Sequence, residues 1–185
     1  MIELKNLYKS YRGKSVLMNI SLTIQDNEFF VLIGSSGCGK TTLLKTLNKL
    51  NPIDKGEILI NGTPINRIKV TQLPRLMGYV VQEGGLFPHM TVEDNIASVL
   101  EMTGKPKEYQ KEKLESLISE FSLQKVRKNL GDRLWGGERR RTEIARCLAI
   151  DPKFIMFDGP FAGLDPIAVA DTNYIVWKRN KSHIG

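Results

Sequence analysis

The run of residues 34–42 constrains the fold more than any other part of the chain. It reads GSSGCGKTT, which matches the phosphate-binding pattern G-x-x-x-x-G-K-[ST]. The apolar run 29–33 precedes it, and leucines at helical spacing follow it. We therefore expect a strand over residues 29–33, a glycine-rich turn and a helix, the context that separates a phosphate-binding loop from a chance match. The alternative is a glycine turn before an ordinary helix.

This turn is expected to bind the phosphates of a nucleotide. Its glycines let the backbone point N–H groups inward, and the helix N-terminus adds partial positive charge. Lys40 can reach the outer phosphates, and the hydroxyl of Thr41 can hold Mg²⁺. The predicted binding residues are Gly34, Ser35, Ser36, Gly37, Cys38, Gly39, Lys40, Thr41 and Thr42.

Composition bounds the remaining possibilities. The 185 residues suit one domain with a sizeable core. No apolar run approaches the roughly 20 residues needed to span a bilayer, and the first residues lack a secretory pattern. We therefore expect any membrane role to need a separate partner chain. The two cysteines, Cys38 and Cys147, fit a reducing cytosol.

The formal charge of +7 can favour nucleic acid, anionic lipid or ATP. The densest basic clusters are residues 125–128, 139–141 and 178–181. They are not interleaved with aromatic side chains, as a surface that binds single strands would be. We interpret these clusters as solvated helix faces.

The remaining pattern indicates an α/β chain with a helical insertion over about residues 87–134. Alternating or apolar runs predict strands at 2–7, 16–24, 57–60, 77–81 and 154–157. The last of these is wholly apolar, which is typical of a strand buried on both faces. Asn61 and Gly62 predict a hairpin turn. Helical periodicity predicts a helix capped by Thr91 and helices at 108–121, 138–149 and 171–178.

Four further motifs follow the phosphate-binding loop in a fixed order. Gln82 ends a strand, residues 134–138 (LWGGE) precede an arginine-rich helix, Asp158 ends an apolar strand, and residues 162–165 (AGLD) come next. In this order and spacing the chain resembles, over essentially its whole length, the ATP-binding subunits of ABC transporters. The resemblance implies a P-loop NTPase of ABC type. It also implies one nucleotide-binding domain over 1–185, with a parallel core sheet and antiparallel N-terminal strands.

The resemblance assigns roles around one ATP and one Mg²⁺. Tyr11 would stack on adenine, although it can also be an aromatic residue at a strand edge. Gln82 would contact Mg²⁺ and the attacking water, and with Lys40 it would form the catalytic set. Asp158 and Thr41 would complete the Mg²⁺ site.

The same resemblance implies a second nucleotide contact and a partner. Its signature loop would be Leu134, Trp135, Gly136, Gly137 and Glu138. This loop would close on a nucleotide held by another subunit, with Asp165 at the dimer seam. Such domains form head-to-tail dimers that sandwich two ATP and drive a transmembrane permease. The resemblance therefore implies a homodimer or heterodimer, in the cytoplasm at the inner face of the membrane, and no nucleic-acid partner.

Two sub-families share the resemblance. Residues 78–82 and 85–91 look like importers of glycine betaine, choline and related osmoprotectants. Residues 137–146 and 158–168 look like the ATPase of the lipopolysaccharide export system. Substrate and direction of transport therefore stay open.

Two residues depart from the pattern of the family. Gly159 follows Asp158 where the family carries a catalytic glutamate, and general-base help is worth roughly 10²–10⁴ in rate. Trp135 replaces the signature serine, whose hydroxyl would donate to the γ-phosphate. We expect the indole to obstruct closure or to cap an open face. Whether the chain is an active enzyme is therefore uncertain.

The third departure concerns the C-terminal end. The chain stops at Gly185, about where the next strand and its switch histidine would begin, and His183 lies in a polar segment. We expect a domain that is incomplete there, lacking a central strand between the P-loop strand and the strand 154–157. Apolar side chains at about 1.5–3 kcal/mol each make such a strand comparable to the whole folding stability.

Three hypotheses remain. The first is an ATP-binding subunit that couples ATP binding and hydrolysis to transport by a separate permease. The second is an impaired or truncated domain that acts as a non-hydrolysing remnant or regulatory partner, which Trp135 and Gly159 favour. The third is a nucleic-acid-associated ABC ATPase, which only the positive charge suggests.

Overall fold

The computed structural model describes residues 1–82 and 84–159. The chain divides into two compact units, Met1–Pro74 and Arg75–Gly185, and α2 (Leu73–Leu76) spans the boundary between them. Asp165, His183 and the expected helix 171–178 lie outside the described residues. Within those residues, no helix is both long and apolar enough to cross a membrane.

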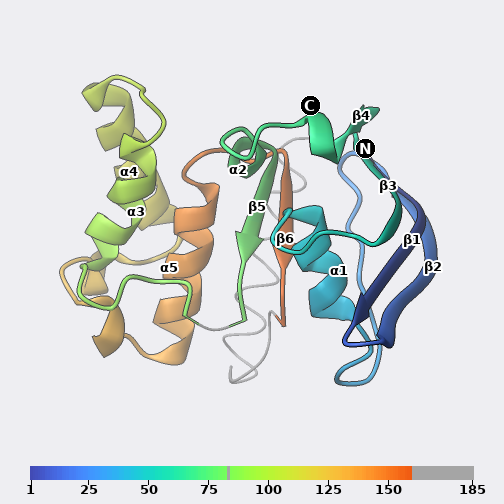
Figure 1. The fold of residues 1–185 in the computed structure, drawn as a ribbon. Helices are drawn as coiled ribbons and strands as arrows, with labels where there is room; N and C mark the ends of the chain where they lie inside the picture. The colour runs from blue at the N-terminus through green and yellow to red at the C-terminus, as the bar shows by residue number, and fades with distance from the viewer. Residues whose placement is uncertain (83, 160–185) are drawn as a thin grey trace. The chain divides into compact units, whose positions relative to one another are not determined.

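The first unit is built on an antiparallel sheet, drawn in blue and green in Figure 1. Its strands are β1 (Ile2–Tyr11), β2 (Lys14–Ile24), β3 (Lys55–Ile60) and β4 (Thr63–Pro64), in the order β2-β1-β3-β4. One helix, α1 (Lys40–Leu47), and a 3₁₀ turn, Ile65–Arg67, complete it. Ile2 and Leu4 are buried on one face of β1. Leu7 is also buried, after a register shift that lies between Leu4 and Leu7. The strands expected at 2–7, 16–24 and 57–60 are confirmed.

The hairpin between β3 and β4 turns at the expected residues. Asn61 and Gly62 have φ of 51° and 75°, and Ile60 pairs with Thr63 across the turn. A two-residue turn with positive φ at both positions matches the right-handed twist of the strands. The Asn-Gly signal therefore fixes the register of this hairpin.

The prediction of a strand before the phosphate-binding loop is wrong. Residues 29–33 are described, and they form no strand. Phe29, Val31 and Ile33 are 63%, 57% and 93% exposed. Hydrophobic sequence alone does not make a strand, because each strand needs a neighbour to satisfy its backbone N–H and C=O groups. Among the described residues no strand pairs with this run, so it has no described ladder on which to form a strand.

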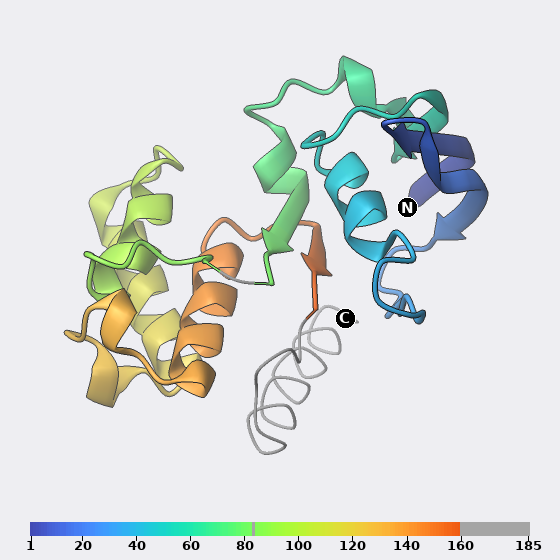
Figure 2. The same cartoon turned by 60° about the horizontal axis from the view of Figure 1, so that its bottom comes forward.

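The second unit contains a parallel pair of strands, β5 (Met77–Val80) and β6 (Phe154–Phe157). They lie side by side in Figures 1 and 2. Both strands were expected, and both are confirmed. The expectation that residues 154–157 are buried on both faces is met in part: Met156 is buried, whereas Ile155 and Phe157 are half-buried and pack against the helical core. Among the described residues β6 pairs with β5 alone, so one long side of this strand has no described ladder to cover it.

Three helices, with the hydrophobic core between them, form the rest of the described part of the second unit (Figure 1). They are α3 (Val92–Glu101), α4 (Lys107–Glu120) and α5 (Gly136–Leu148), joined by 3₁₀ turns at Gln124–Val126 and Gly131–Arg133. The buried side chains include Val92, Ile96, Leu100, Leu117, Ile118, Phe121, Leu123, Ile144, Ala145 and Leu148. The helix expected after Thr91 and the helices expected at 108–121 and 138–149 are therefore confirmed.

The start of α3 is fixed by local signals. Thr91 Oγ1 accepts from the Asp94 N–H at 3.1 Å, and the Asp94 carboxylate accepts from the Thr91 N–H at 3.4 Å. This is the predicted capping box. On the same helix, Glu93 accepts hydrogen bonds from Lys128 and Arg127, which hold its pKa below the ordinary value despite burial.

Candidate functional site

The phosphate-binding loop lies in the first unit and leads directly into α1. Gly37 and Gly39 have φ of 77° and 101°, values that side chains with a Cβ rarely adopt. A Cβ on Gly39 would also lie 3.0 Å from the Val16 carbonyl oxygen of β2. Glycine at position 39 therefore lets α1 begin close against the sheet, with the exposed loop at the N-terminus of that helix.

Lys40 closes over the loop. Its Nζ donates to the carbonyl oxygens of Gly34 and Ser35, each at 2.8 Å, and lies 3.5 Å from Cys38 Sγ. The ammonium group is thus held at the mouth of the loop, where an anion can replace the two carbonyl oxygens as its partner. The fold brings the predicted residues 34–42 together in one turn and the start of one helix.

Tyr11 belongs to the same unit, at the end of β1. It is 41% exposed, and its hydroxyl accepts from Asn51 Nδ2 at 2.8 Å. Lys9 Nζ lies 5.2 Å from the ring centroid and is paired with Asp54 at 2.8 Å. The role of Tyr11 in adenine stacking stays a prediction.

The second unit holds Gln82, Asp158 and Gly159 at the carboxyl ends of β5 and β6. Asp158 is 6% exposed, its N–H donates to the Val80 carbonyl at 3.0 Å, and its Oδ2 accepts from the Tyr79 hydroxyl at 2.9 Å. A Cβ on Gly159 would lie 3.2 Å from the Gln82 side chain. The structure therefore brings together Gln82 and the position of the missing glutamate.

Gly159 adopts a left-handed φ of 53°. A residue with a Cβ is strained there by roughly 1–2 kcal/mol. The backbone after Asp158 thus suits glycine. Apart from the chain neighbours, the atoms nearest to a Cβ at this position belong to the Gln82 side chain.

The predicted signature loop, residues 134–138, lies at the N-terminus of α5. Leu134 is 6% exposed and packs in the helical core, whereas Trp135 is 81% exposed. Trp135 occupies the N-cap position, and its N–H donates to Glu138 Oε2 at 3.0 Å. Gly136 and Gly137 open the helix as predicted. The indole therefore projects from the helix end where an acceptor side chain is usual.

Sequence reasoning missed a set of contacts that bind α5 to the loop after Gln82. Arg140 Nη1 donates to the Val81 carbonyl at 2.9 Å and to Glu143 Oε2 at 3.0 Å. Burial raises the pKa of Glu143, although Arg140 beside it and the Gly85 N–H oppose the shift. Arg146 stacks over the Phe87 ring at 4.3 Å. These contacts hold the backbone on both sides of Gln82.

The burial of Arg140 shows that the prediction of a solvated helix face is wrong for one of the basic clusters. The Arg140 side chain is only 6% exposed, so residues 139–141 are not simply a solvated helix face. Its Nε and Nη2 have no hydrogen-bond partner among the described residues. The one sequence signal for this burial is Glu143, one helical turn further on.

Each unit, taken by itself, holds one predicted residue whose chemistry suits Mg²⁺ bound with a nucleotide. Mg²⁺ usually takes one or two carboxylates together with water and phosphate oxygens. Asp158 supplies one buried carboxylate at a strand end, and Thr41 follows Lys40 at the start of α1. No group of three or more His, Cys, Asp or Glu that could bind a metal occurs in residues 1–82 and 84–159.

A glycine-rich loop that opens a helix, with a buried Asp after a parallel strand, defines a P-loop nucleotide-binding domain. The comparison with protein families then gives the particular class. A family described as ABC transporter matches residues 17–162, so the chain belongs to the ABC transporter family. Its mixed fold of antiparallel N-terminal strands and parallel strands is that of an ABC-type P-loop NTPase.

Curated relatives agree with this assignment. The chain is 43% identical over 182 residues to an uncharacterized ABC transporter ATP-binding protein of Rhizobium meliloti, covering 98% of this chain and 67% of that protein. It is 43% identical over 174 residues to the lipopolysaccharide export system ATP-binding protein LptB of Haemophilus influenzae, covering 93% and 72%. The chain is thus an ABC transporter subunit of the ATP-binding type.

Solved structures show the same fold. A dimeric bacterial ABC transporter cassette superposes with a TM-score of 0.89 at 27% identity, covering 99% of this chain and 84% of the other. The structure of cbiO1 from Clostridium perfringens, part of the transporter complex cbiONQ, superposes with a TM-score of 0.88 at 24% identity, covering 98% and 74%. Another match is a dimeric cassette bound to ADP and phosphate. ATP binding is therefore a property of this family.

Proposed function

We propose that this chain binds Mg-ATP through residues 34–42 and Asp158, and that this binding drives a separate permease. The observation that carries the proposal is the closed loop at the start of α1. Lys40 Nζ lies 2.8 Å from two loop carbonyl oxygens, and Gly39 takes a left-handed φ of 101° against β2. In this conformation the same anion can bind to the loop N–H groups, to the helix N-terminus and to the Lys40 ammonium group.

Mg-ATP binding to the purified chain tests the proposal directly. Calorimetry should show saturable binding, and ATP at 100 times its Kd should raise the unfolding free energy by about 2.7 kcal/mol. Lys40→Ala should abolish both signals. Lys45→Ala is the matched control, because Lys45 lies on the same helix, five positions after Lys40 and outside residues 34–42. Equal binding by wild type and Lys40→Ala would refute the assignment.

We propose further that ATP binding exceeds any hydrolysis, so the chain is a catalytically impaired subunit. Gly159 supplies no general base, and the described side chain beside it is Gln82, an amide. The loss of general-base help is worth roughly 10²–10⁴ in rate. Steady-state turnover of wild type should therefore be far below that of Gly159→Glu.

The strain at position 159 complicates that comparison. Gly159→Glu must adopt a φ of 53° or shift the backbone, so the variant can be less stable for reasons unrelated to catalysis. Gly159→Ala reports this strain without adding a carboxylate. Turnover of wild type equal to that of a folded Gly159→Glu variant would contradict the impairment.

The partners follow from the family. We propose a dimer with a second ATP-binding cassette, in which the signature loop 134–138 faces the nucleotide of the other subunit, at the inner face of the membrane in the cytoplasm. The dimeric cassette structure and the transporter complex that contains cbiO1 support this. The exposed indole of Trp135 favours pairing with an intact cassette. A monomer under all nucleotide conditions, with and without an intact subunit, would count against it.

A further inference from the structure

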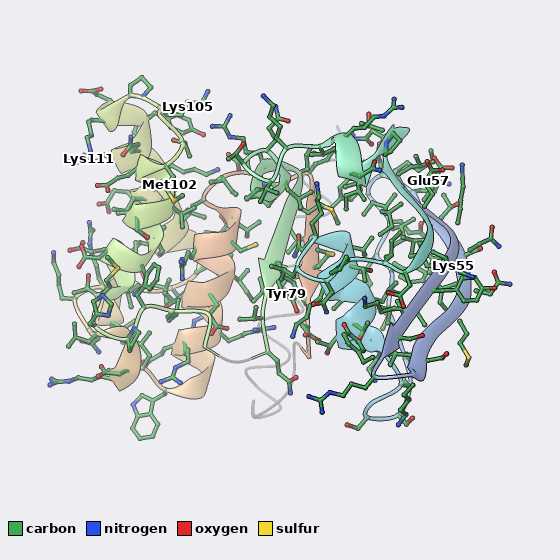
Figure 3. The ribbon with its side chains drawn as sticks, viewed as in Figure 1. Lys55, Glu57, Tyr79, Met102, Lys105 and Lys111 are labelled. Carbon is green, nitrogen blue, oxygen red and sulfur yellow. The ribbon has the colours of Figure 1, made fainter. Side chains whose placement is uncertain are left out.

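We propose that Tyr79 is a positioning residue for the metal site, which holds the Asp158 carboxylate toward the Mg²⁺ of a bound nucleotide. The inference rests on the proposed Mg-ATP binding. Tyr79 lies on β5, 79 positions before Asp158 in the sequence, and its hydroxyl donates to Asp158 Oδ2 at 2.9 Å. Figure 3 shows Tyr79 on β5 next to β6.

The sheet register explains why these two side chains meet. Tyr79 pairs with Met156 in the parallel ladder. Side chains two residues apart on a strand face the same way, so Asp158 follows Met156 on the face that Tyr79 occupies. A tyrosine is long enough to reach a neighbour two residues along the partner strand. The contact is therefore a consequence of register and side-chain length.

The surroundings make the contact strong and durable. Asp158 is 6% exposed, and a hydrogen bond to a charged acceptor gains strength where water is excluded.

The backbone and Tyr79 fix Asp158 from two directions. The Asp158 N–H donates to the Val80 carbonyl at 3.0 Å, which sets the chain at the end of β6. The Tyr79 hydroxyl sets the orientation of the carboxylate itself. Groups that orient a metal-binding side chain typically contribute 10–100-fold to metal affinity.

The chain offers a matched control pair. The Tyr109 hydroxyl on α4 lies 3.4 Å from Asp151 Oδ2, and Tyr109 is 39% exposed. Tyr109→Phe removes the same hydroxyl from the same kind of partner, at a place that the proposed site does not use. Tyr79→Phe keeps the ring, so it leaves the packing beside β6 in place.

The experiment separates metal binding from nucleotide binding. Mn²⁺, which electron paramagnetic resonance detects, is titrated into wild type, Tyr79→Phe and Tyr109→Phe saturated with an ATP analogue that has an imido β–γ bridge. Binding of the analogue alone is measured by calorimetry in EDTA. We expect the Kd for Mn²⁺ to rise about tenfold or more in Tyr79→Phe, with no change in EDTA and none in Tyr109→Phe.

Each outcome decides the matter. An unchanged Mn²⁺ affinity in Tyr79→Phe, with wild type binding nucleotide normally, overturns this inference and leaves the proposed function intact. An equal loss of analogue binding in EDTA also overturns it, because the hydroxyl would then act on the fold and not on the metal. If wild type binds no nucleotide at all, the proposed function fails, and the inference fails with it.

Discussion

Replacing Trp135 by serine should stabilise α5, although tryptophan is much larger. Trp135 is the N-cap of this helix, with φ of −69° and ψ of 159°, and 81% of it is exposed. The Glu138 carboxylate already accepts a hydrogen bond from the Trp135 N–H at 3.0 Å. The indole has no acceptor atom, so it cannot accept a hydrogen bond from the Glu138 N–H. A serine Oγ would accept from the Glu138 N–H and complete a capping box.

The gain is measured against Trp135→Ala, which removes the indole without adding an acceptor. Serine at an N-cap exceeds alanine by about 0.5–2 kcal/mol. For a chain of this size about 1 kcal/mol shifts Tm by roughly 2–4 °C. Urea unfolding and native-state hydrogen exchange of the first turn of α5 measure the difference. Equal stability of the serine and alanine variants would refute the reasoning, because it would show that α5 gains nothing from a capping acceptor.

The structure supports four further predictions. Gly159→Ala should lower the unfolding free energy by about 1–2 kcal/mol because φ is 53°, as urea unfolding can measure; an unchanged midpoint would contradict the backbone geometry. Lys128 holds the pKa of Glu93 below its ordinary value of 4.5. The Glu93 carboxylate therefore stabilises the fold at pH above 4.5, and this stabilisation is lost as the pH falls through the lowered pKa. Glu93→Gln should make the unfolding free energy depend less on pH in acid. Ile33→Ser, at a side chain 93% exposed, should change the unfolding free energy by less than about 0.5 kcal/mol. In contrast, Ile96→Ala in the core should cost about 2–5 kcal/mol.

Local signals in the sequence predicted most of the elements. Gly39, the Asn61-Gly62 turn and the Thr91 cap each act on backbone within a few residues of themselves, so a single sequence contains the whole cause. The same holds for the helical faces, because a periodicity of 3.6 residues is local.

The sequence could not show interactions between distant segments. Whether residues 29–33 form a strand depends on a neighbouring ladder, which hydrophobicity does not reveal. The burial of Arg140 depends on the Val81 carbonyl, 59 positions away. Tyr79 meets Asp158 only because β5 and β6 align in one register. Each of these facts needs the tertiary structure.

The contact between Gly85 and Glu143 has a consequence for evolution. A Cβ at position 85 would lie 3.0–3.1 Å from the Glu143 side chain, so a side chain there requires Glu143 to shift by a few tenths of an ångström. A relative that gains a side chain at 85 should therefore carry at 143 either a shorter residue or a glutamate in a shifted conformation. Substitutions at these two sites are expected to be coupled, although the residues lie far apart in the gene.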